Sequence, residues 1–323
     1  MFKRIFAVLT LCSLFLFSGC RETRSEASRS GSSPLAAERF DVTPPFFKVT
    51  DKNTGAAVYM LGSMHVGKAG AVYPEKMYKA LDESGTLAVE LDTQALQSNK
   101  DEMNAALQVL LCEKGKTAAD YMGDDYADIK KEFRKKGIYN AVYEAYIPSM
   151  WTSLWSNTAV KECGYNSDLG TDNLLISYAK ERGKKIDEIE SAKEQYQVQA
   201  ESSAALQVYI LKETVALSAE ENQEEFDELY DAWKSADTDK LKEMVSEEDG
   251  EVSEELKADY DSYYEMMYTL RQKKMADYVL DRLKNGSDGG VTFMVVGAMH
   301  YAAPPSILDI LEENGYEIEN LNA

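Results

Sequence analysis

The sequence predicts an α/β fold in which two β-α-β units build a central sheet and a large helical insertion lies between them. Two apolar runs, 57–61 and 291–296, are each closed by a glycine and therefore indicate buried strands that stop there. Each run is followed by a loop with proline, a helical stretch that ends at a glycine, and a second strand-like run. Residues from about 94 to 285 are mostly helical in pattern.

The first unit begins with a predicted hairpin, because strand-like runs at 46–50 and 57–61 flank a turn-like segment at 51–55. A loop of small residues then ends at Pro74, a helical stretch reaches Ser84, and the strand 86–91 follows Gly85. A unit of this kind crosses over with a right hand and places its two strands parallel in one sheet.

The insertion contains one strand-like run, 185–190, and two helical regions of interest. The acidic stretch 220–264 predicts an amphipathic helix with a solvated face, because apolar residues recur at spacings of three and four. These apolar residues are Phe226, Leu229, Tyr230 and Trp233. A second long helix, about 253–284, is expected to carry Arg271.

Aromatic residues between 139 and 155 recur at helical spacing and are interpreted as core packing, with a stacking surface for sugar or peptide as the alternative. The second unit closes the chain with the strand 291–296, a loop at 302–305, a helix to Asn314 and the strand 316–321.

The N-terminal residues predict export and attachment to a membrane. Lys3 and Arg4 precede an apolar run at 5–17 that is too short to span a bilayer, so residues 1–19 are predicted to be a signal peptide. Small residues directly before Cys20 are typical of a bacterial lipobox, which makes Cys20 the expected lipidated residue; cleavage without lipidation is the alternative. Residues 20–40 are polar and predict a flexible tether, followed by a folded domain at 41–323.

The expected location is therefore outside the cytoplasm, anchored to a bacterial membrane by lipid. The formal net charge is −21, and it becomes −23 without the signal peptide, which holds two basic residues and no acidic one. Such an acidic surface disfavours nucleic acid as a partner.

Two cysteines, Cys112 and Cys163, remain in the folded domain. In an oxidising compartment this even pair could form a disulfide or stay as two thiols.

The chain contains two histidines, and both stand in the context Gly-x-Met-His, as His65 and His300. Each follows a predicted strand, and ligands of open α/β sheets bind beyond the carboxyl ends of the strands, so one shared site is expected. Glu90 is the candidate third member, because a carboxylate in the run 86–91 is costly to bury without a partner. Asp92 is a weaker candidate on the same face.

Two imidazoles and one carboxylate suit a divalent metal such as Mn²⁺, Co²⁺ or Zn²⁺ with open positions for water and substrate. Metalloprotease H-E-x-x-H, G-x-S-x-G and P-loop motifs are absent, which disfavours a serine hydrolase and a nucleotide enzyme.

At these residues the chain resembles the TraB/PrgY/GumN family, to which the TIKI Wnt-cleaving proteases are related. The resemblance covers about residues 45–323 and rests on segments 59–67, 89–92, 170–172, 189–195, 270–276 and 295–301. Gln272 stands where the family usually has asparagine.

The resemblance implies an α/β core with a helical insertion, similar to TIKI and erythromycin-esterase-like folds, and a metal-dependent peptidase activity. By position it implies that His65, Glu90 and His300 bind metal or act in catalysis, and that Arg271 binds substrate or the transition state. It also implies that Asp172 and Glu190 support these residues. We therefore expect a hydrolase acting on peptides or proteins; the alternative is a lipoprotein that sequesters a peptide or other ligand without cleaving it.

Overall fold

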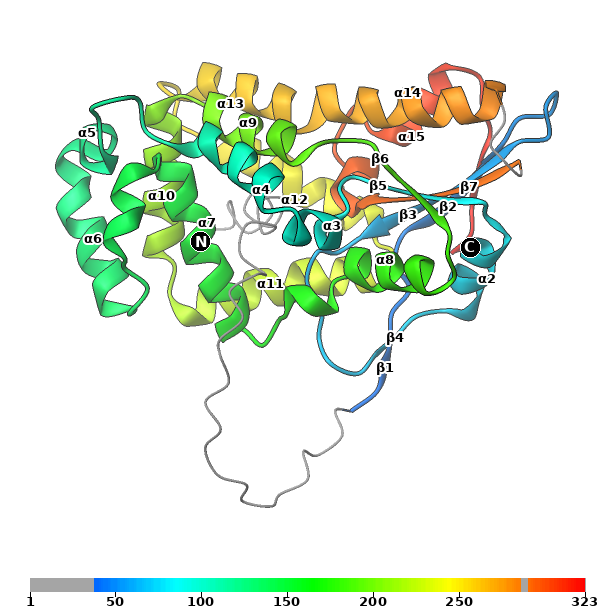
Figure 1. Ribbon diagram of the computed structural model, residues 1–323, viewed down its shortest axis with the longest axis horizontal. Helices are drawn as coiled ribbons and strands as arrows, with labels where there is room; N and C mark the ends of the chain where they lie inside the picture. Colours follow the sequence, from blue (N-terminus) through cyan, green and yellow to red (C-terminus); the bar gives the residue numbers. More distant parts are fainter. Residues whose placement is uncertain (1–37, 286–289, 323) are drawn as a thin grey trace.

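The computed structural model describes residues 38–285 and 290–322, and in these residues six strands form one central sheet (Figure 1). The order across the sheet is β6-β5-β7-β3-β2-β8. The strands are β2 (Phe46–Thr50), β3 (Ala57–Ser63), β5 (Thr86–Val89), β6 (Lys185–Glu188), β7 (Val291–Gly297) and β8 (Ile318–Asn320). The mixed α/β architecture expected from the sequence is thus present.

β7 is inserted between the two strands of the first unit. It pairs parallel with β3 on one side and with β5 on the other, and the β3 register places Ser63 opposite Gly297. β6 runs parallel to β5, whereas β2 is antiparallel to both β3 and β8. The predicted hairpin and the additional strand in the insertion are confirmed.

Three strands are shorter than predicted. The strand expected at 86–91 stops at Val89, the one expected at 185–190 stops at Glu188, and the last covers Ile318–Asn320 of the expected 316–321. A small parallel pair, β1 (Phe40–Asp41) with β4 (Ala71–Val72), has no counterpart in the sequence-based prediction.

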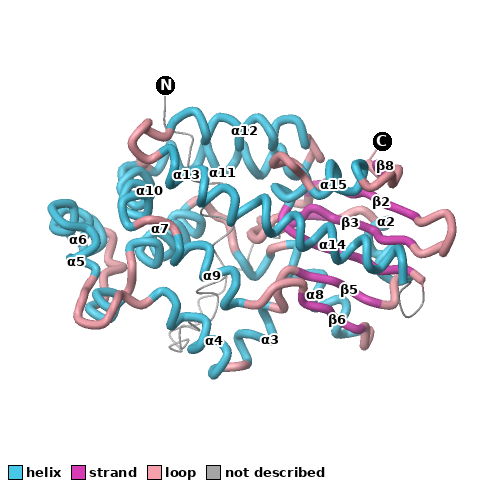
Figure 2. Tube along the Cα trace, turned by 90° about the horizontal axis from the view of Figure 1, so that it is seen from above, coloured by secondary structure: helices cyan, strands magenta, loops and turns pink. Residues whose placement is uncertain are grey.

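Helices cover both faces of the sheet (Figure 2). α14 (Leu270–Asn285) and α15 (Ile307–Glu313) pack on one face, while α2 (Glu75–Glu83) and α8 (Thr171–Glu181) pack on the other. Alternate side chains of β7 supply both cores: Met294 and Val296 contact the first pair of helices, and Phe293 and Val295 the second. β7 is therefore buried on both sides.

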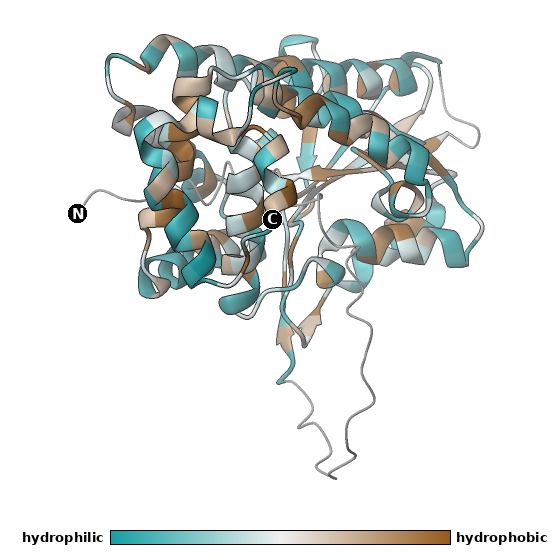
Figure 3. Ribbon diagram, turned by 60° about the vertical axis from the view of Figure 1, so that its left-hand side comes forward, coloured by the Kyte–Doolittle hydropathy of each residue, from teal (hydrophilic) through white to brown (hydrophobic). Residues whose placement is uncertain are grey.

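A helical lobe lies beyond one end of the sheet (Figure 1), and hydrophilic residues are spread over the outer sides of its helices (Figure 3). The remaining helices are α3 (Thr93–Ser98), α4 (Lys100–Leu107), α5 (Ala118–Met122), α6 (Tyr126–Lys135), α7 (Pro148–Glu162), α9 (Ala192–Glu201), α10 (Ala204–Ala216), α11 (Ala219–Lys234), α12 (Thr238–Glu251) and α13 (Lys257–Tyr264). The stretch 220–264, predicted as one amphipathic helix, is divided among α11, α12 and α13. The four spaced apolar residues all lie in α11 and are buried. No helix of residues 38–285 and 290–322 has the length and hydrophobicity needed to cross a membrane.

The aromatic residues between 139 and 155 are packed around Trp151, which is fully buried and has Phe133 and Tyr139 among its ring neighbours. The interpretation as core is confirmed, and the stacking surface is not formed by Trp151 or by Trp155, which is also buried.

A disulfide between Cys112 and Cys163 was one of two alternatives, and the structure has both residues as free thiols. They belong to different parts of the core: Cys112 packs beside the group around Trp151, and Cys163 lies in the group around Trp233. Burial raises the pKa of Cys112 to about 11 and also raises the pKa of Cys163, so neither is a ready nucleophile. The predicted signal peptide and Cys20 lie outside the described residues.

The helix that carries Arg271 contains an irregular turn. α13 begins at Lys257, later than predicted, and runs into a π-helical segment, η6 (Glu265–Thr269), which is followed directly by α14. Insertions of this type are frequent at functional sites because they change which side chains face inward. Arg271 is the second residue after this turn.

Two close backbone approaches hold the segment around His65 against α8. Gly67 and Asn166 exchange backbone hydrogen bonds of 2.9 Å, and the Thr171 amide donates to the Met64 carbonyl at 2.9 Å. A Cβ on Gly170 would lie 2.3 Å from the carbonyl oxygen of His65, a distance that no real Cβ contact reaches. Glycine is therefore required where α8 begins.

We expect Gly170→Ala to lower the free energy of unfolding by about 3 kcal/mol, because the added methyl meets backbone that cannot move aside. Gly137→Ala is the matched control: its φ of 76° is unfavourable for alanine, but no atom lies within 4 Å of the added carbon. This control should cost only about 1 kcal/mol. Urea denaturation of both variants measures the difference, and equal losses would contradict the proposed contact.

Candidate functional site

Four of the residues singled out in the sequence follow the carboxyl ends of four strands. His65 comes after β3, Glu90 after β5 and Glu190 after β6, while His300 lies in the short turn η7 (Ala298–Tyr301) after β7. These strands are neighbours in the sheet, so their ends bring the side chains together. All four are buried, with exposed fractions of 8%, 3%, 5% and 1% in that order.

Arg271 joins two of these residues from above the sheet. Its Nε and Nη2 atoms donate to Glu190 Oε1 and Oε2, both at 2.8 Å, and Nη2 also donates to Glu90 Oε2 at 2.7 Å. Arg271 therefore holds two carboxylates with one guanidinium. Although burial opposes ionisation, the Arg271 charge lowers the pKa of Glu190.

Asp172, in the first turn of α8, contacts His65 directly. His65 Nδ1 lies 2.8 Å from Asp172 Oδ2, and both side chains are buried. Burial by itself would lower the pKa of His65, but the charge and hydrogen bond of Asp172 raise it. Burial would raise the pKa of Asp172, but the charge and hydrogen bond of His65 lower it. Asp172 thereby fixes the ring so that Nε2 faces away from it.

His300 is in a different electrostatic environment. Burial, with a further contribution from Arg271, lowers the pKa of His300 to about 3, so its ring is neutral at ordinary pH. Its Nε2 lies 3.8 Å from Glu90 Oε1. Its Nδ1 is buried and has no hydrogen-bond partner among the residues that the structure describes. One imidazole is thus held by a carboxylate and the other is left with unused hydrogen-bonding capacity.

Gly297, the last residue of β7, leaves a small space between these side chains. A Cβ at this position would lie 3.3 Å from Glu90 Oε1, 3.4 Å from His65 Nε2 and 3.8 Å from His300 Cδ2. Its amide also donates to Glu90 Oε1 at 2.5 Å. The glycine of the second Gly-x-Met-His motif thus keeps open the point on which both histidines and Glu90 converge.

We call His65, Glu90, Asp172, Glu190, Arg271 and His300 together the Glu90 cluster. The cluster contains three carboxylates and one guanidinium: Glu90 and Glu190 contact Arg271, and Asp172 contacts His65. Its net charge is therefore −2 when all three carboxylates are ionised and both imidazoles are neutral. Buried charge of this kind needs compensation by bound protons or a cation. The charge and hydrogen bond of Asp172 raise the pKa of His65, which favours a proton on this ring.

The donor set fits a divalent metal by its chemistry, because imidazole and carboxylate suit Mn²⁺, Co²⁺ and Zn²⁺. A histidine whose other nitrogen is held by a carboxylate, as in His65, is a common arrangement of metal ligands. The distances, however, are not those of coordination: within the described residues no group of three His, Cys, Asp or Glu side chains is arranged to hold an ion. Metal binding therefore requires Glu90 to give up part of its present hydrogen bonding.

Two other residues have roles that the sequence did not reveal. Asp92 is not in the cluster; it caps α3 by accepting from the amides of Gln94 and Ala95, and it pairs with Lys180. Gln195, noted only as part of the family resemblance, donates to Glu90 at 3.3 Å and to Glu190 at 3.1 Å. Its position on α9, five residues after Glu190, is the signal that pointed to it.

Gln272, where the family usually has asparagine, is fully buried beside Arg271. Its Nε2 donates to the Ala303 carbonyl at 3.0 Å, which ties α14 to the loop after His300. The longer side chain therefore makes a structural contact in this chain.

Comparison with known proteins gives one match. The model of the TraB/PrgY/gumN family matches residues 45–320, a range that includes all six members of the Glu90 cluster. No curated protein and no solved structure matches the chain.

The neutral state of buried His300 predicts a specific dependence of stability on pH. Its pKa is about 3 in the folded protein against 6.5 for an unperturbed histidine, so the unfolded chain takes up a proton that the folded chain does not. Stability from this residue is complete above pH 6.5 and is lost as the pH falls toward 3. Lowering the pH from 7 to 5 should decrease the free energy of unfolding of both proteins, and we expect this decrease to be about 2 kcal/mol smaller in His300→Gln than in the parent protein.

The matched control is His65→Gln. The free energy of unfolding of the parent protein, His300→Gln and His65→Gln is measured by urea denaturation in the presence of a metal chelator. The pKa of His65 is raised on folding, so its contribution is present at low pH and is lost as the pH rises through the folded value. Removing it should therefore make the acid-induced loss larger. The same pH response in all three proteins would refute the opposite protonation states of the two rings.

Proposed function

The chain belongs to the TraB/PrgY/gumN family, and from this premise and the chemistry of the Glu90 cluster we propose that it is a metal-dependent hydrolase of the peptidase type. The observation that carries the proposal is the convergence of His65 Nε2, Glu90 Oε1 and the His300 ring on the open point at Gly297. The substrates we propose are peptides or proteins.

The proposed metal is Mn²⁺, Co²⁺ or Zn²⁺, with His65, Glu90 and His300 as the residues that would hold it. When bound, such an ion would activate a water molecule and polarise the carbonyl of the scissile bond. The excess of carboxylates over cationic side chains in this buried cluster supports a divalent cation as the ligand. Replacement of the proton on His65 by the ion would also leave the cluster close to neutral.

The other residues of the cluster would prepare this chemistry. Asp172 holds His65 Nδ1, which directs the Nε2 lone pair toward Gly297. The low pKa of His300 keeps that ring an electron-pair donor. Arg271 holds Glu90 and Glu190 in fixed positions and supplies positive charge next to the site. Glu90 serves either as a metal ligand or as the base whose Oε1 accepts a proton from water. The variant Glu90→Gln, described below, distinguishes these two roles.

We also propose that the protein acts at a membrane surface outside the cytoplasm, through lipid on Cys20. The support is the sequence of residues 1–20, with its basic start, apolar run and small residues before the cysteine. The acidic charge of the chain is consistent with attachment by lipid rather than by a basic patch.

The first test is titration of metal-stripped protein with Mn²⁺, Co²⁺ and Zn²⁺. We expect one site per chain, lost in both His65→Ala and His300→Ala, because each variant removes one of three donors. Hydrolysis of a peptide mixture, followed by mass spectrometry, should fall at least about 10²-fold in both variants. Metal binding that is absent, or unchanged in the variants, would overturn the proposal.

Glu90→Gln distinguishes ligand from base. Loss of metal together with activity identifies a ligand, whereas retained metal with lost activity identifies a base. Asp92→Asn is the matched control, because it makes the same carboxylate-to-amide change two residues away, at a side chain that caps α3. Full activity in Glu90→Gln would exclude both roles. Ligand binding that persists in chelator without turnover would instead favour the sequestering lipoprotein.

A further inference from the structure

A pocket of about 260 Å³ opens between α9 and the η6–α14 segment and touches the Glu90 cluster through Glu190 and Arg271. We call it the α9–α14 pocket. Glu190 and Arg271 are buried, whereas most of the other lining residues are exposed, so these two form its inner end. The same guanidinium contacts Glu90 at 2.7 Å, which places the pocket one side chain away from the proposed reaction centre.

Three apolar residues form part of the wall of this pocket. They are Val198 from α9, Met266 from the π-helical segment, and Leu270, the first residue of α14. Leu270 is 53% exposed, one of four large hydrophobic residues with high exposure among the described residues. An exposed leucine contributes little to the core, and its surface is available to a ligand.

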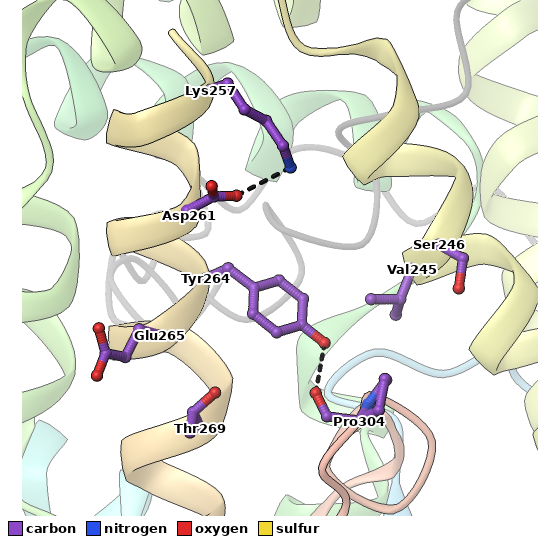
Figure 4. Close-up of a pocket in the computed structure, with 8 residues that line it drawn as sticks. All are labelled: Val245, Ser246, Lys257, Asp261, Tyr264, Glu265, Thr269 and Pro304. Carbon is purple, nitrogen blue, oxygen red and sulfur yellow. Dashed lines mark hydrogen bonds and ion pairs between the residues drawn. The ribbon is translucent and has the colours of Figure 1, made fainter.

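An apolar and a charged residue stand side by side directly after the π-helical turn. Leu270 lines the pocket, while the next residue, Arg271, reaches inward to the two glutamates. Other residues of the same turn, Glu265 and Thr269, line a different and larger cavity of about 550 Å³, which also contains Tyr264 (Figure 4). Lys257 pairs with Asp261 there, and Tyr264 donates to the Pro304 carbonyl. No residue of the Glu90 cluster lines that cavity, so it is separate from the cluster.

Four of the five charged residues that line the α9–α14 pocket pair with one another, and the fifth, Glu201, is exposed to solvent. Glu190 is paired with Arg271 at the inner end, and Glu194 of α9 is paired with Lys274 of α14 at 2.6 Å across the rim. A charged ligand group would have to displace one of these pairs, whereas an uncharged apolar group would bury the exposed leucine. The volume is below the roughly 300–1,000 Å³ of pockets for drug-sized ligands, which suits one or two residues of a peptide.

We propose that the α9–α14 pocket is the specificity pocket of this protein and that it takes an uncharged, large apolar residue of the peptide next to the bond that is cleaved. The inference rests on the proposed hydrolase function and assigns its substrate class. Leu270 is the residue that determines the preference, and Val198 and Met266 complete the contact surface.

The test uses the full chain in two variants, Leu270→Ser and Val142→Ser. Val142 is 55% exposed on the helical lobe and serves as the matched control for removal of exposed apolar surface. Each protein is assayed on peptides that differ at one position, with leucine, alanine, lysine or glutamate. The parent protein should prefer leucine, and Leu270→Ser should reduce the leucine-to-alanine ratio of kcat/KM by about tenfold, while Val142→Ser leaves it unchanged.

Metal titration of Leu270→Ser separates this inference from the proposed function. Normal metal binding and cleavage with a lost preference for leucine supports the pocket. Cleavage with an unchanged preference overturns the pocket and leaves the hydrolase proposal standing. Absence of metal binding and of cleavage in the parent protein overturns both.

Discussion

One buried guanidinium joins the parts of this molecule that meet at the site. Arg271 stands at the junction between the π-helical turn and α14, and it contacts Glu90 beyond β5 and Glu190 beyond β6. Without its charge, two carboxylates would be buried beside each other, and at least one would have to take up a proton. Because α14 also packs on the sheet and is continuous with α13 of the lobe, this contact fixes the lobe relative to the strand ends.

Much of the sheet was predictable because its strands are buried on both faces. The runs that became β3 and β7 are continuous apolar sequences closed by glycine, a pattern that few other elements produce. The convergence of His65 and His300 follows from the same pattern, since both motifs begin where these strands end. The structure adds that β3 and β7 are direct neighbours, with Ser63 opposite Gly297.

The features of the fold and the site that the sequence did not predict depend on contacts between residues far apart in the chain. The sequence favoured Glu90 over Asp92 but left both as candidates on the same face of the predicted strand. The strand stops at Val89, and Asp92 caps α3 while Glu90 enters the cluster. The π-helical turn before Arg271 is equally invisible, since periodicity continues through it. Cys112 and Cys163 form an even pair by count, but they pack in different parts of the core and remain thiols.

The place of β7 in the sheet has a consequence for when the site can exist. This strand follows the helical insertion in the sequence, yet it fills the central position between β3 and β5, which precede the insertion. In a chain without β7, β3 and β5 have no shared neighbour and Glu90 lacks the hydrogen bond from the Gly297 amide. His300, which follows β7, is then also missing. A chain that is interrupted before β7 therefore contains no assembled Glu90 cluster.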